Sequence, residues 1–176
     1  MERAQQYGAM TTPRDNYALA ATYYNIKQYD RAAELLENGL KNGSIENDQK
    51  NWTLLASAYQ VLHKELKAID ALKEGSRRFP KSGELDLQIG NLYYSLDRGA
   101  DAYNYIKVAL EKGVSKPAQA YFFLAYLAFD AKKLDEAQEA VQKAVKLDPH
   151  SKDALRLQGV IRDSIRERDA LKAQPL

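Results

Sequence analysis

The stretch Trp52-Thr53-Leu54-Leu55-Ala56-Ser57-Ala58-Tyr59 begins the pattern that decides the fold. It is followed by a small residue, a large apolar residue, a second small residue and a closing proline, which are Ala68, Leu72, Gly75 and Pro80. Small and apolar residues recur here at helical spacing, and proline cannot continue a helix. The pattern therefore predicts two helices joined by a short turn.

The same pattern recurs along the chain every 34–36 residues. The small residue of the first helix stands at Ala20, Ala56, Gly90 and Ala125, and a fifth candidate is Gly159. A second small residue follows each of the first four after 12 positions, at Ala32, Ala68, Ala102 and Ala137. Two helices approach closely only where side chains are small, so we expect these residues at the helix crossings.

This pattern resembles the tetratricopeptide repeat (TPR), with alanine where glycine often stands. The resemblance implies an all-α fold, a right-handed α-solenoid of four helix-turn-helix repeats plus a C-terminal capping helix. We expect helices at 15–27, 29–41, 48–63, 65–78, 83–96, 99–112, 117–132, 134–146 and 151–171. The repeats are then 13–47, 48–82, 83–116 and 117–150, with the capping helix in 151–172 and a tail at 173–176.

The first residues, 1–12, need a separate interpretation. Met1 to Tyr7 followed by Gly8 resembles the last turns of a second helix and its C-terminal glycine. We expect a remnant of a preceding repeat, which would make the chain part of a longer repeat protein. The alternative is a short N-terminal arm.

Composition favours an interaction scaffold over an enzyme. The 176 residues suffice for one stacked domain, and the net charge of +2 comes from interspersed acidic and basic residues. This distribution does not indicate a nucleic-acid partner, and no apolar run is long enough to insert into a membrane. The chain has no cysteine, and its histidines, His63 and His150, lie in separate repeats. We expect no catalytic residues, no metal site and no cofactor.

A narrower resemblance rests on the segments between the repeats. The long connection within Leu36–Ala56, the segment Gly83-Glu-Leu-Asp-Leu87 and the segment Lys116-Pro-Ala-Gln-Ala-Tyr121 resemble the C-terminal repeats of bacterial periplasmic TPR proteins associated with TonB energy-transduction systems. The resemblance covers about residues 1–147. It implies a periplasmic accessory protein that supports outer-membrane transport through protein contacts; the alternative location is the cytoplasm.

The first helices of TPR arrays line a concave groove, and counting from each small marker gives the side chains that would point into it. The groove is rich in aromatic, amide and hydroxyl groups and has almost no charge. We expect it to bind a protein or peptide segment, because aromatic rings provide apolar area and amides pair with peptide backbone. The candidate residues are Tyr17, Tyr24, Asn25, Ser57, Gln60, Leu87, Asn91, Tyr94, Phe122, Tyr126 and Phe129. The alternative is that several of these aromatic residues fill the core or the seams between repeats.

Two further hypotheses concern partners. Some TPR modules hold a partner's C-terminal carboxylates with lysine and asparagine side chains, but the matching positions here are Tyr17, Ala21, Glu84 and Gln88. Glu84 would repel such a ligand, so the sequence argues against this mode. The alternative function is self-association, in which exposed terminal helices stack on another copy and give a homo-oligomer.

Overall fold

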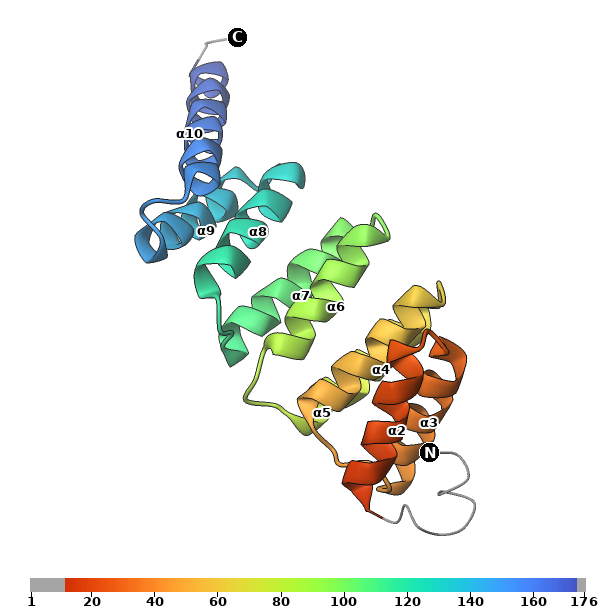
Figure 1. The fold of residues 1–176 in the computed structure, drawn as a ribbon. Coiled ribbons are helices and arrows are strands. Elements are labelled where there is room, and N and C mark those ends of the chain that lie inside the picture. Colours follow the sequence, from red (N-terminus) through yellow and green to blue (C-terminus); the bar gives the residue numbers. More distant parts are fainter. Residues whose placement is uncertain (1–11, 174–176) are drawn as a thin grey trace. The chain divides into compact units, whose positions relative to one another are not determined.

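The computed structural model describes residues 12–173, and these residues form nine α-helices (Figure 1). The helix ends lie within two residues of those expected from the sequence. The helices are α2 (Pro13–Asn25), α3 (Tyr29–Asn42), α4 (Gln49–Val61), α5 (Glu65–Arg78), α6 (Glu84–Ser95), α7 (Gly99–Lys112), α8 (Pro117–Asp130), α9 (Leu134–Leu147) and α10 (Lys152–Lys172). The expectation for residues 1–11 lies outside the described residues.

The chain divides into two compact units, Met1–Phe79 and Pro80–Leu176. The first unit contains the helix pairs α2–α3 and α4–α5, and the second contains α6–α7, α8–α9 and α10. The division lies directly before Pro80, near the end of the second expected repeat, 48–82. Proline has no amide donor and disfavours helical backbone in the residue before it, and α5 ends at Arg78.

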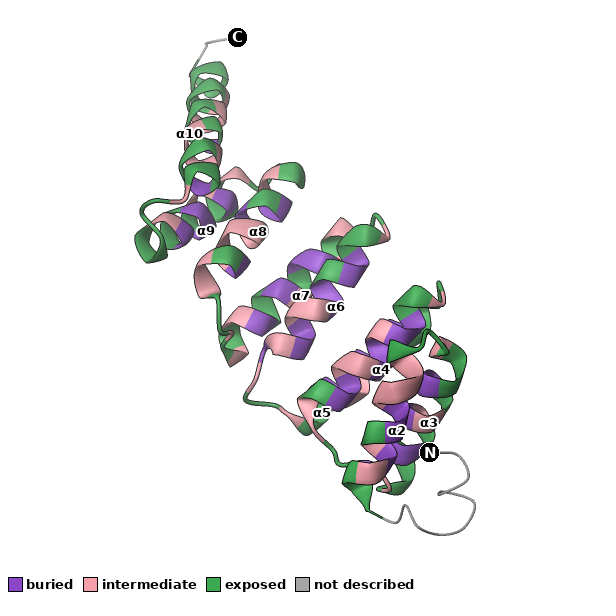
Figure 2. Ribbon diagram, in the orientation of Figure 1, coloured by how far each residue is buried: buried purple, intermediate pink, exposed green. Residues whose placement is uncertain are grey.

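The small residues lie at the helix crossings, as expected. Ala32, Ala68, Ala102 and Ala137 have no exposed surface, and a Cβ atom added to Gly90 would lie 2.6 Å from Cδ1 of Ile106. Figure 2 shows the buried residues along the sides of each helix pair that face each other. Close packing of these faces removes apolar surface from water and holds each pair together.

The four turns within the helix pairs share one backbone conformation. Lys27, His63, Asp97 and Lys132 all have positive φ, between 53° and 62°. In each turn, the residue after the positive-φ residue donates its backbone N–H to a carbonyl near the end of the first helix. After His63, for example, the Lys64 N–H donates to the Tyr59 carbonyl at 2.9 Å. This left-handed turn satisfies carbonyls at the helix end and reverses the chain.

The long connection between α3 and α4 is fixed by side-chain contacts. Ile45 is buried against Gly39, the Asn51 amide donates to the Glu46 carbonyl at 2.8 Å, and the Trp52 indole donates to Asn47 at 2.7 Å. In the second unit, Lys112 pairs with the buried Asp86 at 2.7 Å. The contacts of the connection position α4 relative to α3, and the ion pair joins α7 to α6 within one helix pair.

The last helix, α10, packs on α9 without a partner helix of its own among the described residues. Ser151 caps its first turn by accepting the Ala154 N–H, and Ala154 and Ile161 are buried. Arg168 bonds to Asp135 of α9 at 2.9 Å. None of the helices within residues 12–173 is long and apolar enough to cross a membrane.

Candidate functional site

Every candidate groove residue lies on a first helix of a pair, and none is fully buried. In the first unit, α2 carries Tyr17, Tyr24 and Asn25, and α4 carries Ser57 and Gln60. In the second unit, α6 carries Leu87, Asn91 and Tyr94, and α8 carries Phe122, Tyr126 and Phe129. The sequence predicted one groove for these residues, but they belong to two units, each with its own surface.

The second unit brings two candidate tyrosines into contact. The ring centroids of Tyr94 and Tyr126 are 6.0 Å apart with an interplanar angle of 87°, and the Tyr94 hydroxyl donates to that of Tyr126 at 3.3 Å. Their exposed fractions, 41% and 39%, are high for aromatic residues. We call the surface formed by Asn91, Tyr94 and Tyr126 with the adjoining Phe122 and Phe129 the tyrosine surface.

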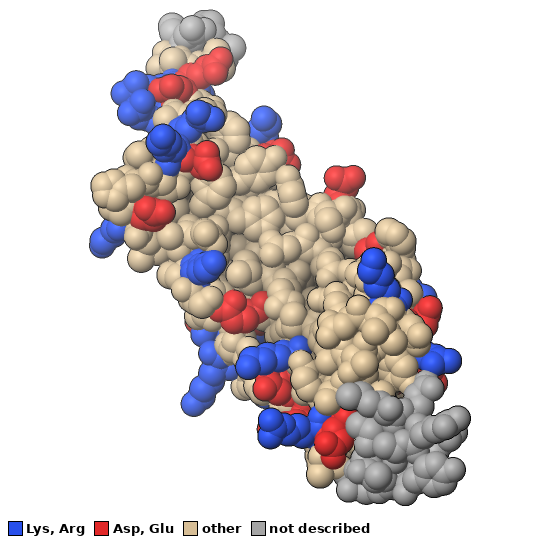
Figure 3. Space-filling view, viewed as in Figure 1, with Lys and Arg blue, Asp and Glu red and all other residues tan. Residues whose placement is uncertain are grey.

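The tyrosine surface has little charge. Figure 3 shows a broad area over α6 and α8 without lysine, arginine, aspartate or glutamate. The side chain of Asn91 is exposed and has no hydrogen-bond partner among the described residues. Its amide is therefore available to a peptide backbone, which needs both a donor and an acceptor.

Phe123 is a member of this cluster that the sequence reasoning missed. Its ring centroid lies 5.2 Å from that of Tyr94 in an edge-to-face arrangement. Residues three apart share a helix face, so the spacing from Phe123 to Tyr126 was the signal that could have found it. Edge-to-face contacts of this kind fix the ring positions and so preorganise the surface.

In the first unit, the candidate residues form a less concentrated surface. Tyr17 and Tyr24 are half-buried, and the Tyr24 ring packs edge-to-face on Tyr29 with centroids 5.1 Å apart. Asn25 and Gln60 are exposed and have no side-chain partner in the part of the chain that the structure describes. Tyr24 therefore contributes partly to packing, as the alternative interpretation held for some aromatics.

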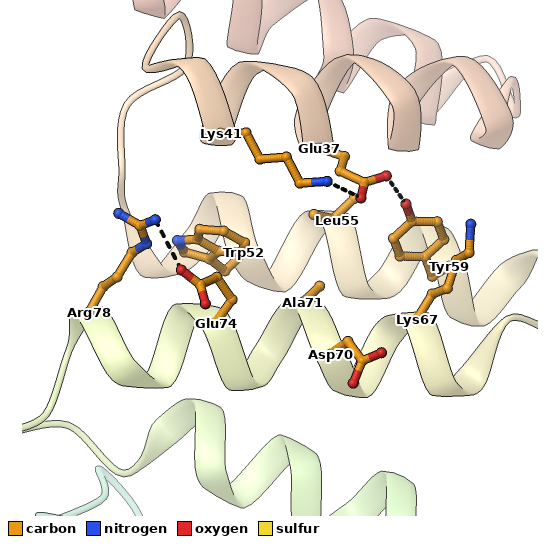
Figure 4. A pocket seen from close by; sticks show the side chains of 10 residues that line it. All are labelled: Glu37, Lys41, Trp52, Leu55, Tyr59, Lys67, Asp70, Ala71, Glu74 and Arg78. Carbon is orange, nitrogen blue, oxygen red and sulfur yellow. Dashed lines mark hydrogen bonds and ion pairs between the residues drawn. The ribbon is translucent and has the colours of Figure 1, made fainter.

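The first unit also has a pocket of about 440 Å³ that the sequence did not indicate (Figure 4). It lies among α3, α4 and α5. Its floor consists of the largely buried residues Trp52, Leu55, Tyr59 and Ala71, and its rim of Glu37, Lys41, Lys67, Asp70, Glu74 and Arg78. The pocket involves the second helices α3 and α5 as well as the first helix α4, whereas the groove hypothesis used first helices alone.

Contacts within this pocket already occupy most of its polar groups. The Tyr59 hydroxyl donates to Glu37 at 2.5 Å, Lys41 pairs with Glu37 at 2.7 Å, and Arg78 lies over the Trp52 ring. The hydrogen bonds from Lys41 and Tyr59 hold the pKa of Glu37 below its ordinary value. Burial and the bond to Glu37 raise the pKa of Tyr59. The arrangement stabilises the contact between repeats more than it offers a free binding site.

The comparisons with known proteins point to one repeat family. The family model described as "Tetratricopeptide repeat" matches residues 118–151. No curated protein matches the sequence. A crystal structure of MamA protein is similar with a TM-score of 0.72 and 20% identity, over 90% of this chain and 85% of that chain.

Two further solved structures carry peptide-binding descriptions. YrrB, described as a TPR protein with an unusual peptide-binding site, has a TM-score of 0.70 and 18% identity over 95% of this chain and 84% of its own. The first TPR of Spaghetti (RPAP3), bound to the HSP90 peptide SRMEEVD, has a TM-score of 0.59 and 20% identity over 67% of this chain and 93% of its own. Residues 118–151 are therefore a tetratricopeptide repeat, and the chain has the all-α fold of TPR solenoid proteins.

Proposed function

We propose that the protein is a non-catalytic scaffold that binds a protein or peptide segment on the first-helix surfaces of its repeats. The observation that carries the proposal is the tyrosine surface. There, two tyrosines expose about two fifths of their area beside the unpaired amide of Asn91. Aromatic residues with a polar tip are enriched where proteins bind one another, and an uncharged centre is typical of such interfaces.

Two features support this proposal over a purely structural role for the aromatics. Tyrosines that pack between helices are buried here, as Tyr59 and Tyr93 show with exposed fractions of 6% and 5%. The fold is also one that generally serves as an interaction scaffold, and two proteins of similar structure are described with a bound peptide or a peptide-binding site. The partner segment would cover the rings of Tyr94 and Tyr126 and bond to Asn91.

The cellular setting is a further part of the proposal. The resemblance of the connecting segments to TonB-associated periplasmic proteins supports a periplasmic accessory role in outer-membrane transport; a cytoplasmic scaffold is the alternative. The buried Ile45 and Asn51 show that the first of these segments has a structural function of its own. The resemblance there is therefore compatible with either setting.

Capture from a Gram-negative envelope extract tests the proposal with three baits. The first bait is the unaltered chain, and the second carries Asn91→Ala and Tyr94→Ala on α6. The third is a matched control with Asn104→Ala and Val108→Ala on α7, which removes an exposed asparagine and an apolar side chain that is 37% exposed. We expect one partner to be retained by the first and third baits and lost by the second. Equal capture by all three would reject the first-helix surface.

Self-association is the second candidate function, and exposed apolar residues on α10 favour it. Leu155 and Val160 are each 45% exposed, and no further helix covers them within the described residues. Sedimentation velocity at several protein concentrations distinguishes the two functions. A mass that increases with concentration and returns to that of a monomer in a Leu155→Ser/Val160→Ser variant would support self-association, whereas a constant monomer would reject it.

A further inference from the structure

Two carboxylates lie beside the exposed tyrosines of the second unit. Asp97 follows α6 and Asp130 ends α8, and the negative charges of both act on the Tyr94 hydroxyl. Neither carboxylate has a hydrogen bond or ion pair with any residue that the structure describes. The Tyr126 hydrogen bond, burial and these charges, in this order of size, raise the pKa of Tyr94.

The backbone adds to this negative potential. The helices α6 and α8 end next to these aspartates, at Ser95 and Asp130, and the last carbonyls of a helix carry partial negative charge. Asp97 itself has φ of 56° in the left-handed turn, which fixes its position relative to the end of α6. The tyrosine surface is thus uncharged at its centre and negative at the end where Asp97 and Asp130 lie.

The basic residues of the neighbouring turns are engaged with other groups. Arg98 pairs with Asp101 at 2.7 Å and lies over the Tyr93 ring, and Lys133 pairs with Glu136 at 3.5 Å. Lys132 lies over the Phe129 ring, with its ammonium 5.9 Å from the ring centroid. None of these three cations forms an ion pair with Asp97 or Asp130. Asp97 and Asp130 therefore remain without an ion-paired cation among the described residues.

We propose that the tyrosine surface binds a lysine or arginine side chain of an extended protein segment, with the charged group between the tyrosine rings and the carboxylates of Asp97 and Asp130. This inference rests on the proposed function and specifies the chemistry of the ligand. An aromatic face attracts a cation, its apolar area suits the aliphatic stem of a basic side chain, and the carboxylates neutralise the charge.

An acidic ligand does not fit this surface. The HSP90 peptide SRMEEVD in the complex with the RPAP3 repeat contains two glutamates and ends in aspartate. Its charges would be repelled by Asp97 and Asp130. This chain should therefore bind a basic segment more tightly than an acidic segment of equal length.

Titration of the ¹⁵N-labelled full chain with three synthetic peptides tests this inference by NMR. The peptides are acetyl-Ser-Pro-Leu-Xaa-Leu-Pro-Ser-amide with lysine, glutamine or glutamate at the central position. We expect chemical-shift changes centred on Tyr94 and Tyr126. The dissociation constant should be about fivefold lower for the lysine peptide than for the glutamine peptide, because the cation gains attraction to aromatic rings and carboxylates at a partly exposed site. The glutamate peptide should bind more weakly than both.

Two variants test whether the preference for the lysine peptide depends on the carboxylates of Asp97 and Asp130. Asp97→Asn/Asp130→Asn should reduce the preference for the lysine peptide over the glutamine peptide, because only the attraction of the cation to the tyrosine rings remains. Glu111→Gln, which removes one exposed charge from α7, should keep the preference. Equal binding of all three peptides by the unaltered chain at Tyr94 and Tyr126 would overturn the cation inference and leave the proposed function standing. Absence of shifts at these tyrosines with every peptide would overturn both.

Discussion

Replacing Gly83 by alanine tests the packing of the second unit at its closest backbone approach. Gly83 directly precedes α6, and its N–H donates to the Gly113 carbonyl at 2.8 Å. A Cβ atom at this position would overlap the carbonyl oxygen of Ala109 and lie 2.7 Å from its carbonyl carbon and 2.8 Å from its Cα. These are backbone atoms of α7, so no side-chain rotation can relieve the overlap.

The expected loss of stability in Gly83→Ala follows from these contacts. Because φ of Gly83 is −86°, alanine accepts the backbone conformation, and the penalty comes from packing alone. Overpacking against a rigid backbone costs about 1–3 kcal/mol, and loss of the hydrogen bond to Gly113 adds about 1 kcal/mol. Alanine recovers about 0.5–1 kcal/mol by restricting the unfolded chain. We expect a net loss of about 2 kcal/mol in the free energy of unfolding.

Gly99→Ala is the matched control. Gly99 begins α7, and an added Cβ atom there would have no atom within 4 Å. This substitution should gain about 0.5 kcal/mol, since alanine has the higher helix propensity and no contact changes. Urea unfolding followed by far-UV circular dichroism measures both variants. A Gly83→Ala chain as stable as the Gly99→Ala chain would refute the close approach of α6 and α7.

Three other predictions concern the core, the turns and a buried phenol. Ile106→Ala should lose about 2–5 kcal/mol, because the side chain is fully buried, whereas Val108→Ala on the same helix should change the unfolding free energy by less than about 0.5 kcal/mol in urea melts. His63→Gly should raise the free energy of unfolding by about 0.5 kcal/mol, because glycine removes the backbone strain at φ 53°. The gain is small because glycine also has more conformational freedom in the unfolded chain. A lower free energy of unfolding at pH 8 would contradict this prediction. Burial, followed by the hydrogen bond to Glu136, raises the pKa of Tyr103 to about 12. The folded state therefore retains this proton more strongly, and the resulting stability is present below pH 10 and is lost as the pH rises through about 12. Unfolding free energies measured across this window should fall more steeply for the unaltered chain than for Tyr103→Phe, and parallel curves would reject the assignment.

Much of the fold could be predicted because the repeat places the same chemistry at the same positions. Ala20 and Ala125 mark helix crossings, and both are fully buried, as the packing argument requires. Pro80 follows the end of α5 closely, which is why that boundary was accurate. These features depend on residue size and backbone chemistry, which the sequence states directly.

The turns and the division into units were not predictable in the same way. The left-handed positions carry lysine, histidine or aspartate, so the usual glycine signal is missing at Lys27, His63 and Asp97. The division before Pro80 reflects contacts inside each unit between helices of different pairs. Residue spacing within one repeat does not contain that information.

The candidate site, too, could be predicted only in part from the sequence. Counting from the small markers placed Tyr94 and Tyr126 on first helices, but their contact joins residues 32 positions apart and depends on the angle between α6 and α8. The charges of Asp97 and Asp130 acting on Tyr94 likewise appear only once the helix ends are positioned. Whether these residues bind a partner stays a prediction.

Site-specific photo-cross-linking tests the binding surface most directly. A benzoylphenylalanine residue is introduced at Asn91 on α6 or at Asn104 on α7, two exposed asparagines on opposite members of one helix pair. After irradiation in an envelope extract, we predict a cross-linked partner from position 91 and none from position 104. A product from position 104 alone, or equal products from both positions, would contradict binding at the first-helix surface.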